Sequence, residues 1–250
     1  MCGRVVVSSS VDVLAAHFDA AETAGLRDTY ELSHNLAPAR ALIGLVRDAN
    51  GDRMLGSYRW GLVPHWADDA SVGNRMFNAR AETVSTSRAF SDALGTRRLA
   101  VLVDGFFEWG PAGGGGAARR RWPFFFHRSD GGPLAFAGLW ETWRPASHRA
   151  AAPLRTCTVI TTSAGADLDG IHDRMPVVLE PDVLDAWLDR RPLDTASLHE
   201  ILRPSEAGTL GHHRVDPSVG NVRNDSADLV APWNPEDHPS AGPEPLRLFG

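Results

Sequence analysis

Short apolar runs, many alternating with polar positions, recur along the chain and predict more strands than helices. Strands are expected at residues 4–8, 41–46, 53–60, 97–107, 123–127, 134–141, 155–162 and 211–215. Most connections between them are short enough for antiparallel pairing, and an Asn-Gly turn within residues 48–52 favours a hairpin. The pattern predicts an α+β fold: a curved mixed, mainly antiparallel sheet or irregular β-barrel with helices packed outside.

Helical spacing of apolar residues occurs in three places. The first helix, capped by Ser10, is predicted to end near Gly25. The second begins at residues 180–182, and the third spans about residues 195–202. Beyond about Pro232 the chain is rich in Pro, Gly and acidic residues and shows no periodicity. Residues 1–232 are therefore expected to form one domain, and residues 233–250 a disordered acidic tail.

A chain of 250 residues with 43% hydrophobic residues and 8 Trp can bury a substantial core. Its two cysteines, Cys2 and Cys157, are too few for a disulfide framework and fit no zinc spacing. A reducing compartment is the default for such a chain, and Cys157 is interpreted as an inert core residue. The sequence shows neither a signal peptide nor about 20 consecutive apolar residues, so a soluble, cytoplasmic protein is expected.

The net charge of −6 argues against bulk affinity for nucleic acid. The charge is uneven, because residues 225–250 hold five acidic residues against one arginine. Arginines also group locally, at residues 75 and 80, 97–98 and 119–121, which is compatible with a local basic groove. A flexible extension over residues 113–121 contains four glycines but lacks the Lys and Ser/Thr that define a phosphate loop.

Cys2 directly follows the initiator methionine. If Met1 is removed, Cys2 carries a free α-amine beside its thiol. Such a 1,2-aminothiol can condense with an aldehyde to an imine and then close a five-membered thiazolidine. An α-amine has an ordinary pKa near ~7.7–8.0, so a fraction is neutral and nucleophilic at neutral pH. The alternative is that the small residue after Met1 merely permits ordinary methionine trimming.

Four further positions carry candidate chemistry. Glu108 follows an apolar run, so it is either an edge charge or a half-buried carboxylate with a raised pKa that can act as a general acid or base. His172 lies in a polar turn, where a surface residue is the simpler interpretation. Trp60 and Trp66 bracket a rigid turn; composition favours core packing, and stacking on nucleobases is the alternative.

Eight short sequence motifs together resemble those of a known protein family. They are MCGR at residues 1–4, NLAP at 35–38, WGLVPHW at 60–66, NARAE at 78–82, GFFEW at 105–109, AGLWE at 137–141, HDRMP at 172–176 and VRND at 222–225. In these motifs, and in their order, the chain resembles the SRAP (SOS response-associated peptidase) family of abasic-site-processing proteins over about residues 2–232. One such motif is weak evidence, whereas eight in order make a chance resemblance remote.

The resemblance implies a protein that binds single-stranded DNA containing abasic sites and forms a covalent thiazolidine through the cysteine after Met1. Met1 itself is removed in what looks like an autocatalytic step. Carried over residue by residue, the implied catalytic set is Cys2, Asn78, Glu108 and His172, and the implied DNA contacts are Arg4, Trp60, Trp66, Arg80 and Arg174. No metal or other cofactor is required. A monomer that associates with the nucleoid when bound to DNA is expected.

Two positions depart from the family's pattern. Phe107 stands where a tyrosine is frequent, and His65 replaces a smaller residue in the tryptophan loop. The implied catalytic set is nevertheless complete. Glu108 is the first candidate for the proton transfers that open an abasic sugar, and His172 can assist because its pKa lies near the working range. Asn78 cannot titrate, but its amide can hold the amine or a carbonyl oxygen in place.

Two other classes of function remain open. Cys2, Asn78 and His172 also suit acyl transfer in an N-terminal-nucleophile amidase or peptidase. The protein could instead be a non-catalytic sensor of damaged single-stranded DNA in which Cys2 is incidental. The arginines and paired tryptophans favour either DNA-binding function over the amidase.

Overall fold

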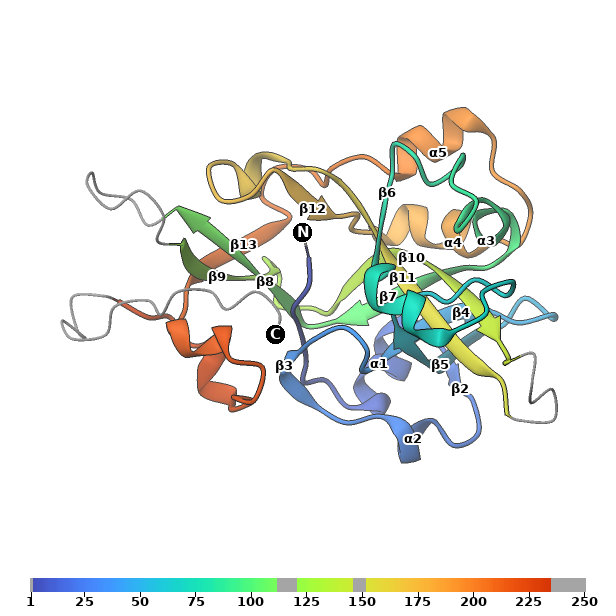
Figure 1. Ribbon diagram of the computed structural model, residues 1–250. Helices are drawn as coiled ribbons and strands as arrows, with labels where there is room; N and C mark the ends of the chain where they lie inside the picture. The colour runs from blue at the N-terminus through green and yellow to red at the C-terminus, as the bar shows by residue number, and fades with distance from the viewer. Residues whose placement is uncertain (1, 112–120, 146–151, 235–250) are drawn as a thin grey trace.

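In the computed structural model, which describes residues 2–111, 121–145 and 152–234, the strands form two sheets (Figure 1). The five-stranded sheet has the order β13 (Leu210–Arg214), β9 (Arg121–Arg128), β8 (Gly105–Pro111), β1 (Val5–Val7) and β3 (Ser33–Leu36). The larger sheet has the order β12 (Arg174–Pro176), β11 (Leu154–Ser163), β10 (Leu134–Trp143), β7 (Arg98–Val103), β4 (Ala41–Arg47), β5 (Arg53–Trp60) and β2 (Ala21–Glu22), and β6 (Asn78–Arg80) pairs with β11.

Three of the described strand pairs are parallel, namely β2–β5, β5–β11 and β6–β11. The remaining described pairs are antiparallel. Helices pack beside the larger sheet: α1 (Val11–Phe18), α2 (Leu26–Thr29), α3 (Ser91–Thr96), α4 (Pro181–Leu188) and α5 (Thr195–Ile201). The described residues also form short 3-10 helices: η1 (Ala70–Arg75), η3 (Ala166–Leu168), η4 (Pro217–Gly220) and η5 (Ala227–Val230). The predicted α+β class with a mainly antiparallel, barrel-like sheet is confirmed.

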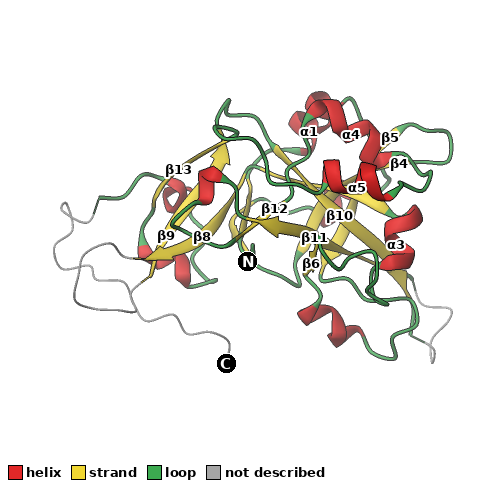
Figure 2. Cartoon of the chain, turned by 90° about the horizontal axis from the view of Figure 1, so that it is seen from above, coloured by secondary structure: helices red, strands yellow, loops and turns green. Residues whose placement is uncertain are grey.

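The alternation of side chains along β7 explains how the layers stack. Leu99 and Val101 belong to a buried cluster shared with Phe106 of the five-stranded sheet. Their neighbours Ala100 and Leu102 belong instead to the cluster shared with the helices. Figure 2 accordingly shows α1, α4 and α5 gathered on the side of the larger sheet away from β9 and β13. The strand β7 is therefore buried on both faces.

The single strand predicted over residues 97–107 is two strands, β7 and β8, in different sheets. The chain turns between them at Asp104, whose carboxylate accepts the backbone N–H of Ser9 over 2.8 Å. A Cβ on Gly105 would lie 2.3 Å from Cε2 of Phe125, so only glycine fits at the start of β8. Because of this turn, Glu108 lies in β8 of the smaller sheet and not in the larger sheet.

The first helix is shorter than predicted, because α1 stops well before Gly25. Asp19 takes a left-handed backbone conformation, with φ of 47°, and its N–H donates to the carbonyl of Ala15. That closes the helix, and the following residues form β2 and α2. At the other end, the hydroxyl of Ser10 accepts a backbone N–H and caps the helix as predicted.

Two predictions fall on segments that lie outside the described residues. They are the tail, beyond residue 234, and most of the extension over residues 113–121. None of the described helices is long and apolar enough to cross a membrane.

Candidate active site

The first strand brings the start of the chain to Glu108. Val5 of β1 pairs with Phe106 of β8 in antiparallel register. Continued toward the N-terminus, this register sets Gly3 opposite Glu108, one residue from Cys2. Cys2 and Glu108 are 0% and 3% exposed. The thiol and the carboxyl group therefore lie in the same buried region between the sheets.

Asn78 holds the backbone of Cys2. It begins β6 and lies beside Val159 of β11 in parallel register. Its Nδ2 donates to the carbonyl oxygen of Cys2 over 2.6 Å. The indole N–H of Trp60 donates to the carbonyl of Phe77 over 2.8 Å. Because Phe77 directly precedes Asn78, the buried Trp60 helps to fix the segment that holds Cys2.

His172 approaches Glu108 from the loop between η3 and β12. Its Nε2 lies 3.7 Å from Oε2 of Glu108, which is close for an ion pair but longer than a direct hydrogen bond. Its Nδ1 accepts the backbone N–H of Arg174 over 2.9 Å and lies 3.1 Å from a carboxylate oxygen of Asp173. Nδ1 also lies 3.2 Å from the carbonyl oxygen of Arg174, so that side of the ring has both a backbone donor and a backbone acceptor, while Nε2 faces Glu108.

A close approach at Gly110 lets the His172 loop reach β8. Alternate residues of a strand share a face, so Glu108 and Gly110 point the same way. A Cβ on Gly110 would lie 3.0 Å from Cγ2 and 3.2 Å from Cα of Ile171. Because Gly110 has no Cβ, Ile171 packs directly against β8, and the next residue, His172, lies close to Glu108.

Burial governs how these groups titrate. It raises the pKa of the Glu108 carboxyl group. Burial, and then the negative charge of Glu108, raise the pKa of the Cys2 thiol. Burial likewise lowers the pKa of His172. At neutral pH the thiol and the imidazole are therefore neutral, and the raised pKa lets Glu108 keep its proton to a higher pH than an exposed glutamate does.

An open depression adjoins the site at His172. Its lining includes His172, Ile171, Arg121, Asp169 and Asp173. Within the part of the chain that the structure describes, no group of three or more His, Cys, Asp or Glu side chains could hold a metal ion.

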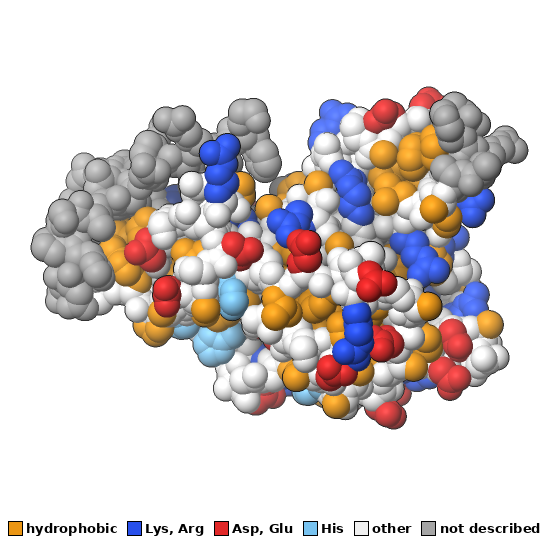
Figure 3. Space-filling model, turned by 90° about the horizontal axis from the view of Figure 1, so that it is seen from below, with side chains coloured by type: hydrophobic (Ala, Val, Ile, Leu, Met, Phe, Trp, Pro, Cys, Tyr) orange, Lys and Arg blue, Asp and Glu red, His pale blue; other side chains and the backbone are white. Residues whose placement is uncertain are grey.

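Two of the five expected DNA-contact residues are exposed. Trp66 is 42% exposed, and the guanidinium of Arg88 lies over its ring, 4.5 Å from the ring centroid. Arg80 is also exposed, at the end of β6. On the face drawn in Figure 3, basic side chains are interspersed with acidic ones, so they form no continuous basic surface there.

The other three expected DNA-contact residues are engaged within the protein. Trp60 is completely buried, so it packs in the core and offers no face to a base. Arg4 donates to Oδ1 of Asn35 over 2.7 Å. Arg174 binds both carboxylate oxygens of Glu82, over 2.5 and 3.0 Å. All three side chains therefore make contacts within the protein, and the DNA contacts expected of Arg4 and Arg174 stay predictions.

The two departures from the family's pattern leave the catalytic set untouched. Phe107 points to the opposite face of β8 from Glu108, where its ring packs 5.3 Å from that of Phe125. A hydroxyl on that ring would therefore not face the site. His65 is exposed, with Nδ1 3.2 Å from the Glu141 carboxylate.

Sequence reasoning gave no role to Asn35, Glu82 or Gly110. Asn35 is buried and donates to the backbone carbonyls of residues 219, 221 and 224, which ties β3 to the C-terminal segment. Glu82 binds Arg174, and Gly110 makes room for the His172 loop. Asn35 and Glu82 lie within the matching motifs, and that position was their only signal in the sequence.

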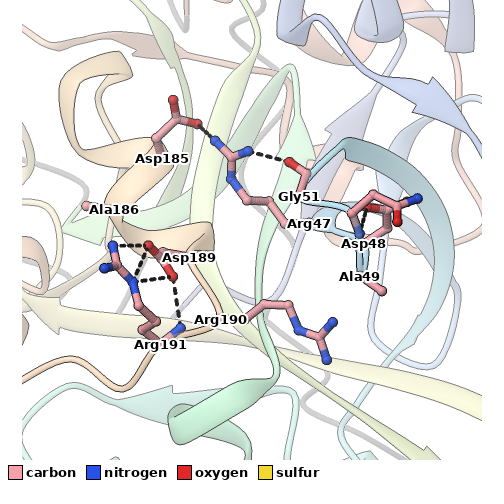
Figure 4. A pocket seen from close by; sticks show the side chains of 10 residues that line it. Arg47, Asp48, Ala49, Gly51, Asp185, Ala186, Asp189, Arg190 and Arg191 are labelled. Carbon is pink, nitrogen blue, oxygen red and sulfur yellow. Dashed lines mark hydrogen bonds and ion pairs between the residues drawn. The ribbon is translucent and has the colours of Figure 1, made fainter.

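A second depression, formed by the β4–β5 turn and the end of α4, is lined by charged side chains (Figure 4). Its charges are largely paired with one another. Arg47 lies 2.7 Å from Asp185, and Arg191 lies 2.6 Å from Asp189. The pairing leaves little excess charge to attract a ligand.

The model of the SOS response associated peptidase (SRAP) family matches residues 1–222 of the chain. The abasic site processing protein YoaM of Bacillus subtilis is 34% identical over 230 residues, which cover 92% of this chain and 97% of that protein. The abasic site processing protein YedK of Escherichia coli is 31% identical over 236 residues, which cover 93% and 100%.

Solved structures share the fold. A protein from Bacteroides thetaiotaomicron aligns with a TM-score of 0.78 at 18% identity, over 93% of this chain and 100% of that one. A protein from Bordetella bronchiseptica aligns with a TM-score of 0.70 at 22% identity, over 86% and 99%. The family match extends over most of the sequence, and the chain belongs to the SOS response associated peptidase (SRAP) family.

Proposed function

We propose that this protein processes abasic sites in single-stranded DNA. In this proposal Cys2, after removal of Met1, forms a covalent thiazolidine with the aldehyde of the opened sugar. The observation that carries the proposal is the hydrogen bond from Asn78 to the Cys2 carbonyl, in an arrangement that also brings Glu108 and His172 together. The names of the relatives as abasic site processing proteins support the same substrate.

The absence of lysine from the sequence sharpens the proposal. The 25 basic residues are all arginines, whose guanidinium groups stay protonated and are not imine-forming amines. The N-terminal α-amine is therefore the only primary amine of this chain. Any imine to an aldehyde forms at the residue that stands first, and that residue is Cys2 once Met1 is removed.

The site residues take distinct roles in the proposed reaction. Glu108, with its raised pKa, protonates the sugar oxygen during ring opening and accepts protons during attack by the amine. His172 relays protons through Nε2, which faces Glu108. Asn78 fixes the Cys2 backbone, so that the amine and the aldehyde meet in a productive orientation.

Ring closure uses the thiol that burial keeps protonated. The amine attacks the aldehyde carbon, and the carbonyl oxygen leaves as water to give the imine. Sγ of Cys2 then bonds to the imine carbon, while the thiol proton passes to the imine nitrogen. The net reaction joins protein and DNA with loss of one water and without oxidation or reduction. The raised thiol pKa disfavours amidase chemistry, in which a thiolate must attack first.

Met1 must leave before the reaction, because a peptide bond on the Cys2 nitrogen removes the amine. The description of the family as a peptidase supports removal within the same site. Intact mass of the freshly expressed Glu108→Gln variant distinguishes the two routes. Retained Met1 assigns removal to this site, and complete loss of Met1 assigns it to a separate aminopeptidase.

DNA binding is assigned to the exposed residues. Arg80 contacts backbone phosphate, which positions the strand without reading its sequence. Trp66 offers a face on which a neighbouring base stacks. Buried Trp60 contributes indirectly, through the segment that holds Asn78.

The proposal is tested by denaturing electrophoresis after incubation with single-stranded DNA that contains one abasic site, without added reductant. The unaltered protein is expected to give a heat-stable adduct, and the Cys2→Ala variant none. Cys157→Ala is the matched control, because it removes the other buried thiol and leaves the N-terminal residue intact. A heat-stable adduct with Cys2→Ala would exclude the thiazolidine.

A further inference from the structure

We propose, on the basis of the function above, that Arg121 binds a backbone phosphate beside the abasic sugar. The contact places one phosphodiester of the bound strand in the depression at His172. Arg121 is absent from the set of DNA contacts that the family resemblance implies, and it lies outside the eight matching motifs. It is therefore a further binding residue for the proposed reaction.

The guanidinium of Arg121 lies on the N-terminal side of β8, although Arg121 belongs to β9. Its Nε donates to the carbonyl oxygen of Trp109 over 2.8 Å, and its Nη2 donates to the same oxygen. Alternate residues of an antiparallel strand point their backbone N–H and C=O groups to the same neighbouring strand. The N–H of Phe107 donates to the carbonyl of Arg4, so the carbonyl of Trp109 also points toward the N-terminal segment. The side chain of Arg121 therefore crosses β8.

This crossing brings a positive charge to the reacting residues. Continued toward the N-terminus, the register of β1 and β8 sets Cys2 opposite Trp109, the residue that holds the guanidinium. Arg121 also lines the same depression as His172. Burial is the main influence on the pKa values of Glu108 and His172, and the charge of Arg121 lowers both. The register and the depression both place Arg121 beside the candidate active site.

The charge of Arg121 remains available to a ligand. Its side chain is exposed, and none of the described acidic side chains forms an ion pair with it. In the second depression, by contrast, Arg47 and Arg191 are paired with aspartates. A guanidinium that is oriented by a neutral carbonyl keeps its full charge and can still donate to phosphate oxygens.

The substrate brings a phosphate to this position. The aldehyde carbon that Cys2 attacks belongs to a sugar with a phosphodiester on its 5′ and on its 3′ oxygen, so an abasic sugar in the site lies between two phosphates. The exposed Asp169 and Asp173 also line the depression and repel an anion. The phosphate is therefore expected on the wall formed by Arg121. A contact there fixes the strand without reading its sequence and helps to orient the aldehyde toward Cys2.

The alternative is a structural role, in which Arg121 only satisfies the carbonyl of Trp109. Two substitutions distinguish these roles. Arg121→Lys keeps the charge, whereas Arg121→Gln keeps a neutral donor. If Arg121 binds phosphate, the salt dependence of DNA binding follows the charge, so Gln loses the contact and Lys retains most of it. If the role is structural, both variants lower Tm and leave the salt dependence unchanged.

The test measures DNA binding by fluorescence anisotropy at several salt concentrations, in a Cys2→Ala background. The probe is single-stranded DNA with one tetrahydrofuran analogue of the abasic site, which has no aldehyde and forms no adduct. Arg121→Gln is expected to weaken binding roughly tenfold, as for loss of one charge-assisted hydrogen bond. The slope of log K against log salt concentration should become shallower by about 0.7, the value for one phosphate of a single strand. An unchanged slope would overturn the proposal.

Arg190→Gln is the matched control. It removes the same charge from an exposed arginine of the second depression (Figure 4). This variant is expected to keep the slope of the unaltered protein. A change in slope equal to that of Arg121→Gln would reduce the effect to net charge and contradict the proposal.

A methylphosphonate series locates the contact. A neutral methylphosphonate replaces, in turn, the phosphodiester on the 5′ and on the 3′ side of the analogue. At one of these positions Arg121→Gln should cause no further loss of affinity, because the charge that Arg121 binds is already gone. Full losses at both positions would overturn the proposal. If the unaltered protein formed no adduct with abasic DNA, the proposed function would fail, while the slope and this series would still decide the role of Arg121.

Discussion

The side-chain amide of Asn78 donates to the carbonyl of Cys2 over 2.6 Å, and this bond connects the two sheets of the protein. Cys2 and Glu108 are placed by the β1–β8 pair of the smaller sheet. Asn78 and His172 are placed by β6 and β12, which both pair with β11 of the larger sheet. The candidate site therefore depends on how the sheets pack, and small changes in that packing should affect the chemistry before they affect folding.

Replacement of Asn78 by Asp keeps the shape of the side chain but removes the donor to Cys2. Two oxygens would then face each other across 2.6 Å. Adduct formation is expected to slow by roughly tenfold to a hundredfold, without loss of DNA affinity. Timed electrophoresis and anisotropy measure the two quantities. Asn74→Asp, at an exposed residue that binds Arg59 outside the site, should keep the normal rate.

Glu108→Gln should stabilise the protein at high pH. The folded-state pKa of Glu108 is raised above 4.5 by burial, so the folded protein holds this proton more tightly than the unfolded chain does. The contribution of Glu108 to the free energy of unfolding therefore falls as pH rises through and above 4.5. Glutamine stays neutral and avoids this loss. Thermal unfolding should show a higher Tm for the variant near about pH 8 and no difference near about pH 4.

Each kcal/mol gained should raise Tm by about 2–4 °C in a chain of this size. The same variant should slow adduct formation by roughly 10²–10⁴-fold, because it cannot exchange protons. DNA affinity should be retained. Equal losses in affinity and rate would make Glu108 a binding residue, and a lower Tm at high pH would contradict the raised pKa.

Gly110→Ala should displace the His172 loop. The added methyl group would press on Ile171 from 3.0 Å, so the loop must lift by a few tenths of an ångström. We expect slower adduct formation and a loss of about 1–3 kcal/mol of stability from overpacking. Gly95→Ala is the control, since nothing lies within 4 Å of its added Cβ. A normal rate for Gly110→Ala would show that the His172 position is not limiting.

Trp60 and Trp66 should respond in opposite ways to substitution. Trp66→Ala removes an exposed ring and should weaken single-strand binding by about 1–3 kcal/mol with little change in Tm. Trp60→Phe removes the indole bond to the carbonyl of Phe77 and should lower stability by about 0.5–1.5 kcal/mol. Anisotropy and thermal unfolding separate the two effects. The reverse pattern would place Trp60 in contact with DNA.

Local patterns in the sequence predicted most strands, because apolar and polar residues alternate along a strand that has one buried face. They did not predict the break at Asp104, whose partner Ser9 is 95 residues away in the chain. The same reason limits prediction of the site. Cys2 and Asn78 are separated by 76 residues, and no local pattern specifies that they meet. Only the family resemblance predicts that these residues form one catalytic set.

Residues that act through shape or pairing were the least predictable. Gly110 matters because a loop 61 positions later lies against it, and nothing in the sequence around Gly110 indicates that contact. Glu82 lies in a polar segment without periodicity, where an acidic residue is unremarkable until Arg174 is found beside it. Trp60 was assigned to DNA by resemblance, whereas composition alone had favoured the buried position that it occupies.

The most direct measurement is the intact mass of the protein before and after incubation with abasic single-stranded DNA, with and without borohydride. The free protein should lack Met1, and the adduct should weigh the sum of protein and DNA less one water. Because the chain has no lysine, Cys2→Ala should give an adduct only when borohydride traps an imine at its N-terminus. A stable adduct of Cys2→Ala without borohydride, or of protein that retains Met1, would contradict a thiazolidine at Cys2.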